Sequence, residues 1–176
     1  MSVPMSRANR VAGALSFVGG VIVAAGTFLT WFHLEGQTSG PRFSFGFFTI
    51  YQLGDFNAGF WYSVAGAVIL FGAVLLVSAG VALFGVLSGN QFTLWPPIVM
   101  AVGTLVVVAG ALGTGLPHWF SQEPLWWSRG PGEMMCLWGA GVGFLALLVV
   151  VRSRVLDART VSISSHEMGE KVPTGA

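Results

Sequence analysis

Histidine, methionine and cysteine side chains stand beside the apolar runs of this chain, where they could bind a metal. His33 follows the first run, His118 follows the third, and Met134–Cys136 begins the fourth. These residue types together suit copper, and two histidines alone can ligate a haem iron. No H-x-x-H, C-x-x-C or M-x-x-M spacing holds two of them on one helical turn. We therefore predict no cofactor, and His33 and His118 are the least favoured candidates for a site.

Nucleophilic catalysis is also weakly encoded. Ser121 lies three residues from His118, and Cys136 lies three residues from Glu133. A nucleophile needs a positioned base, and this spacing arises by chance in short polar loops. With Cys136 as its one cysteine, the chain cannot form an intramolecular disulfide, which excludes the four-helix thiol oxidoreductases. We predict that the protein is not an enzyme.

The elements that carry these residues are four apolar runs, at about 11–30, 63–87, 97–116 and 134–151. The chain is 54% hydrophobic and 9% charged, whereas a soluble domain carries about 25% charged residues. Each run is long enough to cross a hydrocarbon core of about 30 Å as a helix. The sequence therefore predicts an all-α integral membrane protein, an antiparallel four-helix transmembrane bundle with a small aromatic cap outside the cytoplasm.

None of the four predicted spans contains Asp, Glu, Lys, Arg or His. A charged group at mid-bilayer costs at least about 2.5 kcal/mol and is usually retained for transport, proton relay or sensing. This pattern argues against a proton-coupled transporter, a pump and a charge-lined channel. The formal net charge of +1 gives no reason to expect a nucleic-acid partner.

The distribution of arginines predicts the orientation. The arginines near the span ends are Arg7, Arg10, Arg152, Arg154 and Arg159 on one side, and Arg42 and Arg129 on the other. The positive-inside rule places both termini in the cytoplasm and the protein in the cytoplasmic membrane. We expect a tail over 1–10, a membrane domain over 11–156 with outer loops 32–59 and 117–132, and a mobile tail over 157–176. The first run is interpreted as a retained anchor rather than a cleaved signal peptide.

Small residues are spaced so that helices could approach closely. Lipid is as apolar as leucine, so helices in a bilayer associate through small residues that let backbones meet. The predicted packing residues are Ala12, Ser16, Gly20 and Ala24 in the first span, and Gly139 and Gly143 in the fourth. These faces could pack within the chain or against another subunit.

The first outer loop carries an unusual aromatic segment. Phe43, Phe45 and Phe47 alternate with smaller residues, the period of a strand with one apolar face. A lone strand is unstable, so it must pack on the loop 117–132, on the bilayer or on a partner; a short interfacial helix over 47–53 is the alternative. The predicted contact residues are Phe43, Phe45, Phe47, Phe48, Tyr51, Trp126 and Trp127. Other aromatics, Trp31 among them, fit an aromatic belt at headgroup depth.

Two resemblances bear on function. Trp31 and the "GFW" of Gly59 to Trp61, in a four-span plan, resemble claudin-like proteins in topology, without their cysteine pair. The run "GTFLTWF", Gly26 to Phe32, followed by an aromatic loop, resembles small uncharacterised four-span membrane proteins of actinomycetes. Such proteins can be accessory subunits of larger envelope complexes, including lipid importers. The resemblance assigns no functional residue.

From these observations we expect a non-enzymatic accessory or assembly subunit that docks a larger membrane protein complex among membrane lipids. An apolar patch larger than a belt requires is typical of an interaction surface. The alternative is binding of a lipid or another hydrophobic ligand at the outer leaflet, and an outer-face metal or haem site is less favoured.

Overall fold

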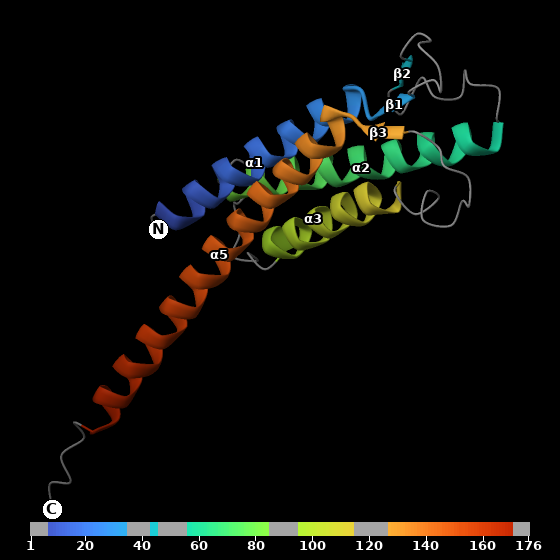
Figure 1. Ribbon diagram of the computed structural model, residues 1–176. Helices are drawn as coiled ribbons and strands as arrows, with labels where there is room; N and C mark the ends of the chain where they lie inside the picture. Colours follow the sequence, from blue (N-terminus) through green and yellow to red (C-terminus); the bar gives the residue numbers. More distant parts are fainter. Residues whose placement is uncertain (1–6, 35–42, 46–55, 85–94, 115–126, 171–176) are drawn as a thin grey trace, which may run out of the picture.

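The structure is a computed structural model that describes residues 7–34, 43–45, 56–84, 95–114 and 127–170. Within these ranges the chain forms four long helices and three short strands (Figure 1). The helices are α1 (Arg7–Phe28), α2 (Phe56–Leu83), α3 (Trp95–Gly113) and α5 (Pro131–Glu170). The strands are β1 (Phe32–Leu34), β2 (Phe43–Phe45) and β3 (Trp127–Arg129).

All four helices contain a segment long and apolar enough to cross a membrane, which fits a multi-pass membrane protein. These segments are Arg7–Phe28, Val64–Leu83, Trp95–Gly113 and Pro131–Leu156. The helices start where the sequence allows: Pro96 and Pro97 occupy the first turn of α3 and Pro131 that of α5, where a missing backbone N–H leaves no bond unmade. The fourth helix is the one that departs most from expectation, since it begins before Met134 and continues to Glu170.

α1 lies between α2 and α5, and two sets of buried residues face these neighbours. Both sets alternate between steps of four and three residues, the spacing that keeps one face of a helix against a partner. The set toward α5 is Gly19, Val23 and Gly26, and the set toward α2 is Gly13, Ser16 and Gly20. α1 is thus buried on two adjacent faces.

Glycines let the backbones meet at these interfaces. A Cβ on Gly19 would lie 2.7 Å from the carbonyl oxygen of Gly139 in α5, and one on Gly20 would lie 2.8 Å from that of Ala73 in α2. Real Cβ atoms essentially never approach this closely. The contact distances therefore require glycine on both faces of α1.

Neighbouring helices meet in a consistent order along their lengths. Gly13 lies against Gly80, and Gly20 lies against Ala73. Residue numbers at the contacts therefore increase along α1 as they decrease along α2. The same order relates Gly19 and Gly26 of α1 to α5, where they meet residues around Gly139 and then Cys136.

Three-residue strands join the chain after α1 to the chain before α5. β1 is central, with antiparallel partners β2 and β3, in the order β2-β1-β3. Phe32 is opposite Phe45 on one side and Arg129 on the other. Figure 1 shows the sheet at the end of the bundle away from the N-terminus, which we call the sheet end.

Candidate functional site at the sheet end

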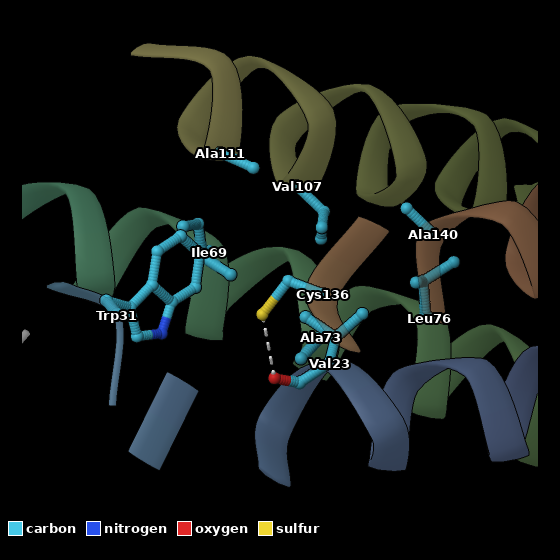
Figure 2. Close-up of a cluster of buried hydrophobic side chains, with 9 residues drawn as sticks. All are labelled: Val23, Trp31, Ile69, Ala73, Leu76, Val107, Ala111, Cys136 and Ala140. Carbon is cyan, nitrogen blue, oxygen red and sulfur yellow. Dashed lines mark hydrogen bonds between the residues drawn. The ribbon is translucent and has the colours of Figure 1, made fainter. Parts of the chain in front are cut away.

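Trp31 is the centre of a buried corner where α1 leads into the sheet. Its side chain is 0% exposed, and its indole Nε1 donates a hydrogen bond to the carbonyl of Gly26, at 2.9 Å. Figure 2 shows the indole beside Ile69 of α2. An aromatic belt requires a ring in contact with headgroups, so the expectation that Trp31 belongs to such a belt was wrong. The indole serves as a packing element with its one donor satisfied.

Two glycines preceding and opening α5 close around Trp31. The N–H of Gly130 donates to the carbonyl of Trp31, at 2.7 Å, and the N–H of Gly132 donates to that of Thr30, at 3.0 Å. A Cβ on Gly132 would lie 2.6 Å from the indole, and one on Gly130 would clash with the Thr30 carbonyl oxygen. These positions therefore fasten the end of α1 to the start of α5.

Glu133 is buried in the first turn of α5, with 4% of its surface exposed. A carboxylate at a helix N-terminus interacts favourably with the helix dipole. The sequence predicted an outer loop over 117–132 and a fourth span over 134–151, which left Glu133 between the two. In the structure Glu133 belongs to α5, which begins at Pro131.

Cys136 lies one turn further along α5 and is fully buried. Its Sγ donates a long hydrogen bond to the carbonyl of Val23, at 3.4 Å (Figure 2). Val107 and Ala111 of α3 belong to the same buried cluster. A reactive cysteine needs a partly exposed, electropositive setting. The environment of Cys136 is that of a structural thiol.

The predicted metal candidates are not brought together in the described part of the chain. His33 occupies the middle of β1, opposite Ser44 and Ser128, while His118 lies outside the described residues. Among the residues that the structure describes, no group of three or more His, Cys, Asp or Glu side chains could hold a metal ion.

The predicted contact residues are placed only in part. Phe43 and Phe45 are the ends of β2, opposite Leu34 and Phe32, and Trp127 is opposite Leu34 in β3. Thus β2 pairs with the start of its own loop, and β1 carries the link to the segment before α5. Four further predicted residues lie outside the described part: Phe47, Phe48, Tyr51 and Trp126.

The predicted packing residues all lie on described helices. Ser16 donates a hydrogen bond from Oγ to the carbonyl of Leu76 in α2, at 2.7 Å, and Gly20 contacts the same helix. Gly139 meets Gly19 of α1, and Gly143 lies between Gly19, Leu76 and Thr104. Ala12 is buried, whereas Ala24 is half-buried.

Several important residues escaped the four-residue pattern: Gly13, Gly19, Gly26 and Gly132. Alternating steps of four and three residues, starting at Ala12, would have found two of them, Gly19 and Gly26. A search for spacing that keeps one face toward a partner is thus the better signal here.

The described residues at the sheet end link the end of α1 to the start of α5 through buried contacts. Their buried groups are an indole, a thiol and two glycines in mutual contact, together with one carboxylate. No protein-family model matches the chain, and no curated protein gives a significant match.

Proposed function

We propose that this chain is a non-enzymatic integral membrane subunit that docks a larger membrane protein complex. Its four helices form an antiparallel bundle in the cytoplasmic membrane, with both termini in the cytoplasm and an aromatic cap on the outer face. The order of glycine contacts along α1, α2 and α5 supports the antiparallel arrangement. The orientation is supported by four arginines at the membrane edge opposite the sheet end: Arg7 and Arg10 at the start of α1, and Arg152 and Arg154 near the end of the spanning part of α5.

The interior of the bundle supports a structural role. Glycines on α1, α2 and α3 meet a neighbouring helix at distances where even a methyl group would clash. A Cβ on Gly72 of α2, for example, would lie 2.7 Å from Val107 and 3.0 Å from the Gly103 carbonyl oxygen, both in α3. Close backbone contact of this kind fills the space that a translocation path would need, and it produces a stiff scaffold.

One observation carries the docking role: α5 is longer than the bundle needs. Of its 40 residues, Pro131–Leu156 are the 26 that could span a membrane, and the last 14 continue as helix. Figure 1 shows this part extending well beyond α1, α2 and α3. A helix that projects from a stiff scaffold is suited to contact another protein. We call residues 157–170 the α5 extension.

The test is extraction of the full chain from its native membrane into lipid nanodiscs, followed by native mass spectrometry. The proposal predicts a stoichiometric protein partner at native expression levels. A monodisperse chain that carries lipid alone would contradict it. If that lipid were lost with Phe43→Ser and Phe45→Ser, the outer-leaflet ligand would replace the subunit as the function.

A further inference from the structure

The α5 extension has little to stabilise it within the part of the chain that the structure describes. The spanning part of α5 supplies its nucleus, but a helix tail in water still depends on helix propensity or on packing. This one also contains β-branched residues and a glycine, which rank low in helix propensity: Thr160, Val161, Ile163 and Gly169. In Figure 1 the extension lies away from the other described elements. A partner along one of its faces would supply the missing stability.

One face of α5 runs without charge from the spanning part into the extension. Its members alternate by four and three residues along the helix: Leu137, Gly141, Phe144, Leu148, Val151, Val155, Ala158, Ser162, Ser165 and Gly169. Phe144, Leu148, Val151 and Val155 are 47–49% exposed, and a Cβ on Gly141 would meet nothing within 4 Å. We call this face the α5 seam. Its part in the extension consists of small residues, which favour close approach of another helix.

Basic residues flank the seam where it leaves the spanning part. Arg152 follows Val151, Arg154 precedes Val155, and Arg159 follows Ala158, so all three occupy positions beside the seam. The acidic residues of the extension occupy the other helical positions: Asp157, Glu167 and Glu170. In paired helices these flanking positions select the partner by charge. The seam therefore fits a helix with acidic flanks.

A second copy of this chain does not have such flanks. Two parallel copies would place Arg154 opposite Arg159 of the second copy, because flanking contacts join residues five apart. An anionic bilayer surface also fits less well. The extension continues in line with the spanning part (Figure 1), and it covers about 21 Å at 1.5 Å per residue. Arg152, Arg154 and Arg159 lie within reach of headgroup charge, but the far half of the extension lies beyond the Debye length of about 8 Å at physiological ionic strength, so headgroups cannot cover the whole seam.

We propose that the α5 seam docks a helix of another membrane protein, one with small interfacial residues and with Asp or Glu beside them. This inference rests on the proposed function, since it names the surface and the chemistry of the partner. Packing of small residues would bring the two helix backbones close together. The paired charges would fix the alignment of the two helices and select the partner.

The test uses the full chain in phosphatidylcholine nanodiscs and two labelled helical peptides of about three heptads. Both peptides carry Ala and Ser at the interfacial positions; one has Glu at the flanking positions and the other has Lys. Fluorescence anisotropy should show that the acidic peptide binds at least about tenfold more tightly, with an affinity that falls as salt is added. Equal affinities, or no binding of the acidic peptide, would overturn the proposal.

Matched variants separate the seam from overall charge. Arg159→Glu should weaken binding of the acidic peptide about tenfold or more. The double variant Thr160→Glu with Ser164→Glu changes the net charge equally but alters positions away from the seam, and it should leave the affinity nearly unchanged. Circular dichroism of each variant checks that helix content is retained. Equal losses in both variants would show a nonspecific charge effect and contradict the proposal.

Two further outcomes identify other occupants and would each overturn it. Intermolecular disulfides in dilute vesicles with Ser162→Cys, but not with Ser164→Cys, would assign the seam to a second copy. Displacement of the acidic peptide by phosphatidylglycerol in the nanodisc would assign the arginines to lipid.

The failure of this inference is distinguishable from failure of the proposed function. If the chain leaves the native membrane with a stoichiometric partner and Arg159→Glu retains that partner, the subunit role stands and the seam is wrong. If the wild-type chain leaves as a monomer, the subunit role is wrong whatever the peptides do.

Discussion

α5 packs mainly against α1 and α3, and these two interfaces are built differently. Toward α1, glycines meet backbone, and Cys136 donates to the Val23 carbonyl across the interface. Toward α3, Gly143 instead meets the Thr104 side chain, whose Oγ1 has no hydrogen-bond partner among the described residues. A methyl group on Gly143 would lie 3.3 Å from that oxygen. At the interface with α1 the backbones are in close contact and the Cys136 thiol has a hydrogen-bond acceptor. At the interface with α3 a buried hydroxyl has no hydrogen-bond partner among the described residues.

This difference indicates that α1 and α5, joined at the sheet end by Trp31, form the rigid unit of the protein. The face of α3 toward α5 packs less closely and can be altered at lower cost, whereas its face toward α2 is close at Gly72 and Gly103. Four substitutions test this division, and each is measured as a change in the free energy of unfolding in micelles on titration with a denaturing detergent.

The largest effect is expected for Trp31→Ala. Truncation of a fully buried aromatic leaves a cavity and should cost about 3–5 kcal/mol; here it also frees the Gly26 carbonyl. Trp138→Ala is the control, because Trp138 lies on the same bundle but is 72% exposed. Similar losses in both variants would contradict a special role for the corner.

Gly139→Ala should be the next most damaging. Its new methyl would lie 2.7 Å from the Gly19 carbonyl oxygen, which cannot move without α1, so the cost should be about 1–3 kcal/mol. Gly141→Ala, two residues along the same helix, adds its methyl where nothing lies within 4 Å. The gain in helix propensity should then make that control neutral or slightly stabilising. Equal destabilisation would refute backbone contact as the cause.

Ser16→Ala should cost about 1 kcal/mol, since it removes the hydrogen bond to the Leu76 carbonyl between α1 and α2. Ser78→Ala is the matched control, because Ser78 Oγ donates to the Leu75 carbonyl within its own helix. A loss for Ser78→Ala as large as that for Ser16→Ala would show that the contact between helices adds nothing.

The smallest effect should come from Thr104→Val, and its sign is informative. A buried hydroxyl without a partner costs free energy, so its replacement by a methyl of similar shape should be neutral or stabilising, by up to about 1 kcal/mol. A clear loss of stability would mean that the α3 side depends on this hydroxyl, and the contrast between the two interfaces would fail.

The spans were predictable because apolar length and composition alone identify them. The packing of α1 was only half predictable. Ser16 and Gly20 follow the four-residue spacing that the sequence analysis used. Gly19 and Gly26 follow alternating steps of four and three residues, a spacing that becomes apparent only when one face of α1 is assumed to pack along a partner helix. Burial of Trp31 was missed because a tryptophan at the end of a span has the same local pattern whether its ring faces headgroups or protein.

The segments between and after the spans were harder to predict. Alternation predicted an extended segment at Phe43–Phe45, where β2 lies, but β1 and β3 are too short for any periodicity to show. The polar segment from 157 was expected to be mobile because its composition favours neither helix nor core. Its helical continuation to Glu170 follows from the spanning part of α5, which supplies the nucleus that an isolated helix lacks.

The most direct test of the account compares the full chain with a chain that ends after Leu156, both extracted from the native membrane and analysed by native mass spectrometry. The account predicts that the full chain carries a stoichiometric partner and that the shortened chain loses it, while the free energy of unfolding of the bundle stays unchanged. Retention of the partner by the shortened chain would contradict docking through the α5 extension.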